Sequence, residues 1–251
     1  MSLPIKSIEY FTKKYGMHLI GGRRIYSIPL NERKYGYERC VPFYLKLNDF
    51  VNNDNRFGRV IPELFKYLQA KYPKPIEDII KFRTPWSRAA VFGDHKFMAN
   101  CVQVLDNLYM SINFTGLHAT WFIQDLINFF NPKIEDYLFY VRVPCMNEPT
   151  EVKNDFGILV VESFKIHLKE QGKTDKSIEI ILKNIGKLNK FLQTLNIGWN
   201  DFYLIDELKN YQVIKARVFD YIRKHQILNE DQIEIANKSL NYLYNFMKTF
   251  N

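Results

Sequence analysis

The sequence predicts an α+β fold that is predominantly helical, with a mixed α+β N-terminal domain followed by a C-terminal four-helix bundle. Hydrophobic residues make up 47% and aromatic residues 16% of the 251 residues, which is enough for a substantial core and too much for a disordered chain. Strand-like runs alternate with helical patterns in the first part, whereas only helical spacing continues after it. The segment 144–155 has two prolines and no periodicity. It is the predicted boundary between domains 1–150 and 156–251.

In the N-terminal domain, turn and cap residues set the expected elements. Two β-compatible runs flank Gly21-Gly22, which favours a hairpin because primed turns need positive φ. Pro42 favours an edge position for its strand, and Asp94 is a suitable N-cap for a helix after it. In chain order we expect a helix over 4–15, the hairpin, a strand over 40–47, a loop over 48–58, helices over 59–72, 76–82, 95–110 and 117–130, and a strand over 137–143. The run 83–93 is compatible with either a strand or a loop.

The C-terminal domain has the cleaner pattern. We expect helices over about 157–171, 175–195 and 204–225, and a last one that begins after Asn229. Thr174 or Asp175 caps the second helix, and Asn229 with Gln232 forms a capping box for the fourth. The apolar stripe of the second helix is sustained for five turns by Ile178, Ile181, Leu182, Ile185, Leu188, Leu192 and Leu195. Four amphipathic helices with short connections predict a small bundle.

The net charge of +8 is unevenly distributed. Residues 1–100 hold 18 Lys and Arg against 9 Asp and Glu, a net of +9, whereas residues 101–155 hold 3 against 7, a net of −4. A segregated basic excess attracts polyanions, of which nucleic acid is the commonest. A lysine-rich composition without any such partner is the alternative interpretation.

Two regions carry the candidate nucleic-acid contacts. The second bundle helix has four lysines in one narrow sector, roughly 160° from its apolar stripe, where ammonium groups can follow a phosphate backbone. The densest basic and aromatic stretch covers residues 23–39, where arginine on phosphate and tyrosine on bases would suit a single strand. The candidate residues are Arg23, Arg24, Arg33, Lys34 and Arg39, interleaved with Tyr26, Tyr35 and Tyr37, and then Lys173, Lys176, Lys183, Lys187 and Lys190. Either region is also compatible with a solvated surface that binds nothing.

The bundle resembles the SAM-like core-binding domain of phage integrases, the tyrosine recombinases. The likeness rests on Gly172-Lys173-Thr174, Ser177-Ile178 and Phe191-Leu192, and on the closing helix 237–250. It covers roughly 95 residues, and Ile181 stands where the family often has an aromatic residue. The resemblance implies DNA contact by a helical clamp. No catalytic domain follows, so we expect no recombinase activity.

A second resemblance concerns chemistry. Arg88 and His95 are separated by six residues, as in the motif of HEPN ribonucleases. There His would act as general acid or base on a ribose hydroxyl and Arg would stabilise the phosphate charge, without a metal. Pro85 and Gly93 disturb the helical context that this motif requires. A surface arginine and a histidine in the first turn after Asp94 are the simpler interpretation.

The sequence lacks the motifs typical of cofactor sites, metal sites, disulfide frameworks and membrane spans. No phosphate-binding loop is present, no two histidines stand four residues apart, and three widely spaced cysteines give no disulfide framework, so we expect reduced thiols, no metal and no cofactor. The N-terminus lacks the apolar core of a signal peptide, and no apolar run is long enough to span a membrane. We therefore expect a cytoplasmic protein.

The favoured function is nucleic-acid binding, DNA before RNA, in a protein from a mobile element, phage or defence system. The alternatives are the metal-independent ribonuclease and a protein–protein interaction module. Whether the chain is an enzyme, and whether it forms a homo-oligomer, stay open.

Overall fold

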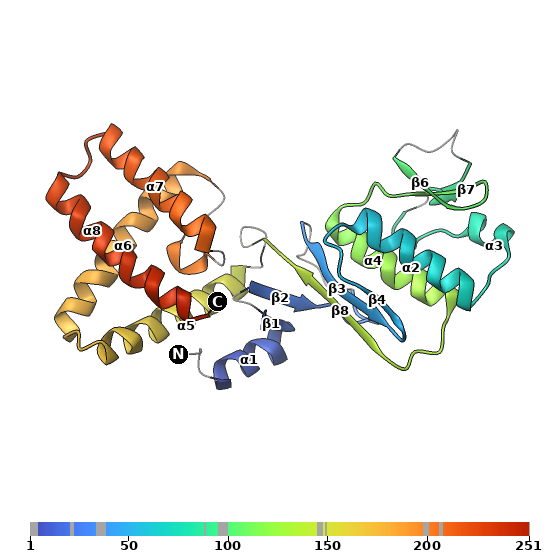
Figure 1. Ribbon diagram of the computed structural model, residues 1–251, viewed down its shortest axis with the longest axis horizontal. Coiled ribbons are helices and arrows are strands. Elements are labelled where there is room, and N and C mark those ends of the chain that lie inside the picture. The colour runs from blue at the N-terminus through green and yellow to red at the C-terminus, as the bar shows by residue number, and fades with distance from the viewer. Residues whose placement is uncertain are drawn as a thin grey trace. The chain divides into compact units, whose positions relative to one another are not determined.

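The computed structural model describes residues 5–20, 23–33, 39–87, 89–94, 100–144, 148, 150–197, 201–205 and 208–250, without the side chains of residues 5–8, 209 and 250. The fold is α+β and predominantly helical, as the sequence predicts. The chain divides into two compact units (Figure 1). Unit 1 contains residues 1–24 and 148–251, and unit 2 contains residues 25–147.

The division corrects the expected N-terminal domain of residues 1–150. Its first 24 residues belong with the helical unit, because their side chains pack on the first bundle helix. Phe11 is buried with its ring centroid 5.9 Å from that of Phe156, and Tyr15 donates a hydrogen bond to Asp155. These partners lie at least 140 residues apart in the sequence, so local patterns do not reveal them.

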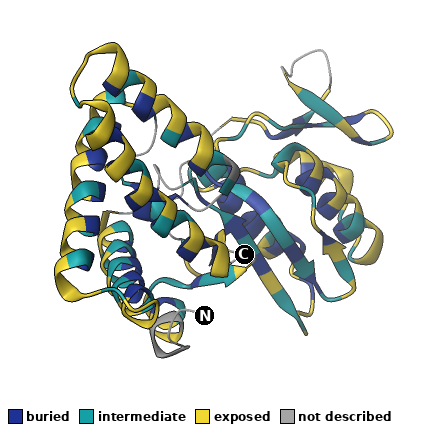
Figure 2. Cartoon of the chain, turned by 60° about the vertical axis from the view of Figure 1, so that its left-hand side comes forward, coloured by how far each residue is buried: buried dark blue, intermediate teal, exposed yellow. Residues whose placement is uncertain are grey.

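Unit 1 begins with α1 (Ile5–Tyr15) and β1 (Met17–Ile20), followed by the start of β2 (Arg23–Ser27). Its bundle consists of α5 (Thr150–Glu170), α6 (Asp175–Leu195), α7 (Leu208–Lys224) and α8 (Glu230–Met247), with the short 3-10 helices η3 (Phe202–Leu204) and η4 (Lys248–Phe250). Helix α6 contacts the other three bundle helices, as a four-helix bundle requires. Figure 2 shows buried residues along one side of each helix and exposed residues along the other.

Most of the bundle predictions are confirmed. The side chain of Thr174 accepts a hydrogen bond from the backbone N–H of Ser177, and Asn229 and Gln232 form the expected capping box. Gly172 has a φ of 74° and ends α5. Two helices begin elsewhere than expected: α5 starts seven residues before the predicted 157, and α7 begins at Leu208 rather than 204.

Unit 2 contains most of a five-stranded sheet, whose first strand β1 belongs to unit 1, and helices of unit 2 cover one face of it. The strands β3 (Val41–Leu47), β4 (Phe50–Asn52) and β8 (Tyr137–Arg142) join β1 and β2 in the order β1-β2-β8-β3-β4, and the registered pairs are antiparallel. Helix α2 (Phe57–Lys71) packs on β3, β4 and α4 (Gly116–Phe130) (Figure 1). The short α3 (Ile76–Lys81) and a second sheet, β5 (Phe92–Gly93), β7 (Leu108–Ser111) and β6 (Cys101–Leu105) in that order, complete the unit.

The second sheet corrects the largest error in the sequence analysis. A helix over 95–110 was expected, but residues 101–111 form the hairpin β6–β7, joined by Asp106 and Asn107. Asn107 adopts a φ of 57°, as a tight two-residue turn requires. A short apolar run can fit either a helix or a strand, and here Leu108 and Met110 of β7 are buried in alternation with half-buried Tyr109 and Ser111.

The first sheet contains two smaller corrections. The predicted loop over 48–58 includes β4, because Asn48 takes a φ of 53° and turns the chain directly back along β3. Pro42 was expected at a sheet edge, but β3 lies between β8 and β4. Strand β4 pairs only with Leu45–Leu47 of β3, so the missing N–H of Pro42 interrupts no pairing with β4. On the other side, the β3–β8 register shifts between Pro42 and Tyr44.

Candidate nucleic-acid interface

The outward face of α6 is fixed by its buried stripe. Ile178, Ile181, Ile185, Leu188 and Leu192 are all less than a tenth exposed and pack into the bundle. Thr174 caps the N-terminus, and Asn196, with a φ of 47°, ends the helix. With both ends and the inner side determined, the residues about 160° from the stripe must face solvent.

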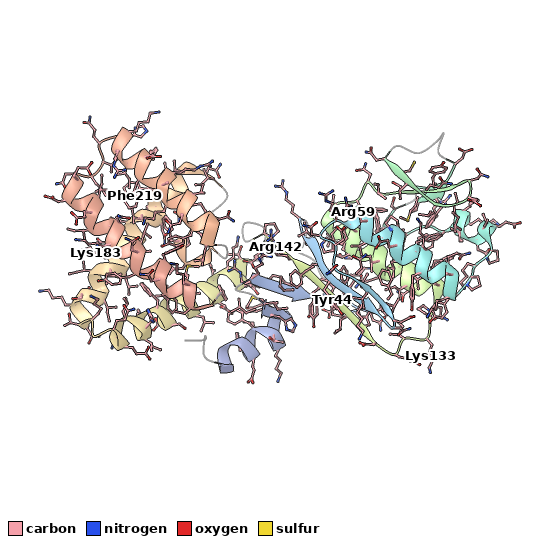
Figure 3. The ribbon with its side chains drawn as sticks, in the orientation of Figure 1. Tyr44, Arg59, Lys133, Arg142, Lys183 and Phe219 are labelled. Carbon is pink, nitrogen blue, oxygen red and sulfur yellow. The ribbon has the colours of Figure 1, made fainter. Side chains whose placement is uncertain are left out.

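The four lysines of the predicted row occupy that outer side. They are Lys176, Lys183, Lys187 and Lys190, and all four are exposed. At 100° and 1.5 Å per residue they fall within a sector of about 60° and a length of about 21 Å. None of them forms an ion pair with any residue that the structure describes. We call these four residues the lysine row, of which Figure 3 labels Lys183.

Only one of the residues beside the row, Glu179, carries a negative charge. Glu179 is exposed on one side, Ile180 on the other side is 48% exposed, and Gly186 carries no side chain. The one aromatic residue of α6, Phe191, is half-buried and lies beside the row rather than within it. Because stacking on bases requires aromatic rings, this surface suits the charged backbone of a nucleic acid rather than its bases.

A hollow of about 140 Å³ adjoins the row between α6 and α8. Lys187 lies on its α6 side, and Gln232 and Ile235 lie on its α8 side. The first turn of α8 carries Glu230 and Asp231, both exposed. The negative charges of these carboxylates repel an anion from the N-terminus of α8. A polyanion bound at the lysine row would therefore lie along α6.

Lys173 differs from the four lysines of the row. It precedes α6, is half-buried, and holds its Nζ atom 4.8 Å from the ring centroid of Tyr242 on α8. A cation over an aromatic face is stabilised there. Lys173 therefore contributes to packing between helices, and a phosphate contact would compete with that interaction.

Arg24 is not available for the predicted phosphate contact. Its guanidinium donates hydrogen bonds to both carboxylate oxygens of Glu148 at 2.7 and 2.9 Å and to the carbonyl oxygen of Leu204 at 3.1 Å. Its Cζ atom lies 4.7 Å from the ring centroid of Phe156. The side chain is 2% exposed. The expectation is corrected because Glu148, Leu204 and Phe156 hold Arg24 in the interior, whereas its neighbour Arg23 is exposed.

Arg33 is also committed to partners within its unit. Its guanidinium donates a hydrogen bond to Asp125 and lies 5.3 Å from the ring centroid of Trp121. Asp125 accepts a second hydrogen bond from the indole N–H of Trp86 at 2.9 Å. Burial raises the pKa of Asp125, and the charge of Arg33 acts in the opposite direction. The arrangement is a structural ion pair, which corrects the expected phosphate contact at Arg33.

The other predicted residues are exposed, buried or outside the part of the chain that the structure describes. Arg23 and Arg39 are exposed, whereas Tyr26 is fully buried and has no surface for a base. Lys34, Tyr35, Tyr37, Arg88 and His95 lie outside the described residues. The structure therefore brings together the lysine row, whereas among the described arginines of residues 23–39, Arg24 and Arg33 are held by internal partners.

One aromatic surface could not be predicted from the sequence. Tyr44 on β3 and Tyr140 on β8 pair across the sheet, with ring centroids 6.4 Å apart, and Arg142 lies on the same strand as Tyr140 (Figure 3). Both strands were predicted, and their alternation would have placed these residues on one face. Which face the helices cover could not be inferred locally.

The described residues include no group of three or more His, Cys, Asp or Glu side chains placed to hold a metal ion. Burial raises the pKa of the Cys40 thiol to about 12, so this side chain is a poor nucleophile near neutral pH. Among the helices that the structure describes, none is both long enough and apolar enough to cross a lipid bilayer.

Comparisons of the chain with protein families, with curated proteins and with solved structures found no match in any of the three. The resemblances to integrases and to HEPN ribonucleases consequently stay predictions.

Proposed function

We propose that this protein binds nucleic acid, with duplex DNA as the favoured partner, and that the lysine row of α6 contacts the phosphate backbone. The observation that carries the proposal is that four exposed lysines lie in one narrow sector and none is ion-paired with a described residue. Each phosphate neutralised by such a lysine releases condensed counterions, which favours binding.

The surroundings of the row support a backbone contact. A straight helix presents the ammonium groups over about 21 Å, which is roughly six base-pair steps at 3.4 Å. The row offers neither aromatic rings nor the amide and guanidinium groups that read base edges. We therefore expect binding with little dependence on sequence.

Fluorescence anisotropy with a labelled short duplex tests the proposal. The triple variant Lys183→Gln, Lys187→Gln, Lys190→Gln should weaken binding and should reduce the slope of log K against log salt by about 0.9 for each lysine between about 50 and 200 mM salt. The duplex should be tested with two unrelated sequences, and the two affinities should agree.

Unit 1 offers a matched control for the change in net charge. Lys169 and Lys238 are exposed and Lys165 is partly exposed, but all three are ion-paired, with Asp175, Glu234 and Glu162 respectively. Replacing these three with Gln changes the charge equally, and we expect a much smaller effect on the slope. Equal effects of the two triple variants, or no duplex binding by the wild type at about 50 mM salt, would reject the proposal.

A further inference from the structure

Helices α6 and α8 of unit 1 lie side by side and run in opposite directions (Figure 1). Midway along α6, the side chain of Asn184 donates a hydrogen bond to Ser239 Oγ at 3.2 Å. Further along α6, Lys187 shares the hollow of about 140 Å³ with Gln232. The residue numbers rise along α6 while those of the neighbours fall along α8, so the helices are antiparallel and the hollow opens along the seam between them.

Two exposed isoleucines follow this seam. Ile180 lies one turn before Asn184 and is 48% exposed, and Ile235 lies one turn before Ser239 and is 51% exposed. Because the helices are antiparallel, the two side chains lie on opposite sides of the Asn184–Ser239 contact, about 12 Å apart along the seam. The hollow beside Ile235 has three more apolar lining residues, Leu188, Leu228 and Ala236. We call the strip from Ile180 to the hollow the α6–α8 groove.

The two rims of the α6–α8 groove differ in charge. The α6 rim is the lysine row, none of whose members is ion-paired with a residue that the structure describes. On the outward side of α8, Lys238 is paired with Glu234 at 2.7 Å, and Asp231 adds a negative charge near the hollow. A partner in the groove therefore meets an excess of positive charge on the α6 side only. Complementarity selects apolar side chains with carboxylates along one flank.

We propose that the α6–α8 groove binds an acidic amphipathic helix of a partner protein, and that this partner excludes nucleic acid from the lysine row. A helix that lies in a groove presents apolar residues at i, i+4 and i+7. The separation of about 12 Å between Ile180 and Ile235 corresponds to about eight residues of such a helix. Its carboxylates pair with the lysines that run beside the two isoleucines.

Other polyanions use this surface less completely. A phosphate backbone neutralises the lysines but leaves Ile180 and Ile235 against charged, hydrated groups, which does not bury their apolar surface. A flat lipid surface covers the isoleucines but cannot enter the concave hollow, whereas a side chain of a docked helix can. Binding of the helix is independent of the nucleic-acid function, and only the exclusion rests on that proposed function.

Labelled synthetic helices of about 18 residues, which span about 27 Å, test the partner chemistry by fluorescence anisotropy. The first has leucines at i, i+4, i+7 and i+11 and glutamates along one flank of that stripe. The second has glutamines in place of the glutamates, and the third has the composition of the first with its leucines distributed around the helix. In about 50 mM salt the full-length protein should bind the first at least about fivefold more tightly than either of the others. Equal affinities, or no binding of the first helix, would overturn the proposal.

Paired substitutions then locate the contact. Ile180→Ser with Ile235→Ser should weaken binding of the acidic helix at least about fivefold, because two apolar contacts are lost. The same pair should leave the duplex affinity unchanged, because neither isoleucine contacts phosphate. Ile166→Ser with Val213→Ser is the matched control, since these side chains are 51% and 55% exposed on α5 and α7. An equally large effect of the control pair would contradict the assignment.

Competition tests the exclusion. The unlabelled acidic helix should displace a labelled duplex from the wild-type protein, and the triple lysine variant should bind both partners more weakly. If the duplex does not bind, the nucleic-acid function and the exclusion fail while the peptide comparison still stands. Simultaneous binding of duplex and helix would overturn the exclusion. Binding to phosphatidylserine vesicles that requires Ile180 and Ile235, without binding of the acidic helix, would assign the groove to a membrane and reject the proposal.

Discussion

Arg24 and Glu148 form a bidentate ion pair that is almost completely removed from solvent. The Nε atom and one terminal nitrogen of Arg24 donate to the two carboxylate oxygens at 2.7 and 2.9 Å, and the side chains are 2% and 0% exposed. The same guanidinium also donates to Leu204 O and faces the ring of Phe156. A single side chain thereby joins β2, the segment before α5, α5 itself and η3.

Removing one partner of this pair should strongly destabilise unit 1. Arg24→Ala leaves the Glu148 carboxylate buried without its cation, and we expect the free energy of unfolding to fall by about 3–5 kcal/mol. Urea denaturation followed by circular dichroism measures this change. Lys165→Ala, which removes an exposed pair with Glu162, should change the stability by less than about 1 kcal/mol and serves as the control. A similarly small loss for Arg24→Ala would contradict the structural role.

Two glycines of unit 1 should respond oppositely to the same substitution. A Cβ atom at Gly186, within α6, or at Gly172, after α5, would meet nothing within 4 Å, so neither change causes a clash. Gly186 is in a helix interior, where alanine is favoured by roughly 0.5–1 kcal/mol. Gly172 has a φ of 74°, in the left-handed region, where alanine is strained by about 1 kcal/mol.

Thermal unfolding should therefore place Gly186→Ala above and Gly172→Ala below the wild type. Gly186 lies beside the lysine row without contributing charge, so duplex affinity should not change in Gly186→Ala. Equal shifts of the two variants would contradict the backbone argument.

The capping box of α8 should contribute measurably to the bundle. The side chain of Asn229 accepts a hydrogen bond from Gln232 N at 2.9 Å, and the side chain of Gln232 accepts one from Asn229 N at 3.1 Å. Asn229→Ala should lower the free energy of unfolding by about 1 kcal/mol, whereas Asn229→Ser should keep most of it because serine also caps. Equal urea midpoints for the two variants would show that the cap contributes nothing.

The success of the sequence analysis depended on how local the determining contacts are. The bundle was predictable because the stripe of α6 and its cap residue Thr174 lie within one segment. For the same reason the lysine row was identified correctly as an exposed surface. The hairpin β6–β7 was missed because a short apolar run satisfies both periodicities, and only the pairing of Val102 with Met110 resolves them.

The roles of the arginines were not predictable in the same way. Arg24 and Arg23 are adjacent and chemically identical, but Glu148, 124 residues further along, makes one of them structural. Asp125 does the same for Arg33, with a separation of 92 residues. A charge count shows how many cations the chain has, whereas the availability of each one depends on tertiary partners. The pairing of Tyr44 with Tyr140 has the same kind of origin, because it requires β3 and β8 to be neighbours.

Asp49, in the turn between β3 and β4, should titrate at unusually low pH. Its carboxylate accepts hydrogen bonds from Lys71 Nζ and Tyr67 Oη of α2, both at 2.5 Å, and these interactions lower its pKa from 3.8 to about 2. Because the folded-state pKa is the lower one, the stabilisation is fully present above pH 3.8 and is lost as the pH falls through about 2. Carboxyl chemical shifts followed by NMR during an acid titration measure this pKa.

The same titration separates the two donors. Lys71→Gln removes the stronger influence and should raise the pKa of Asp49 most, and Tyr67→Phe should raise it less. Tyr67→Phe keeps the ring beside Phe50, where the centroids are 5.2 Å apart, so the packing of the turn on α2 should not change. An Asp49 pKa near 3.8 in the wild type would show that the turn is not held to α2 by these bonds. The β3–β4 hairpin, which forms one edge of the sheet, would then need another anchor.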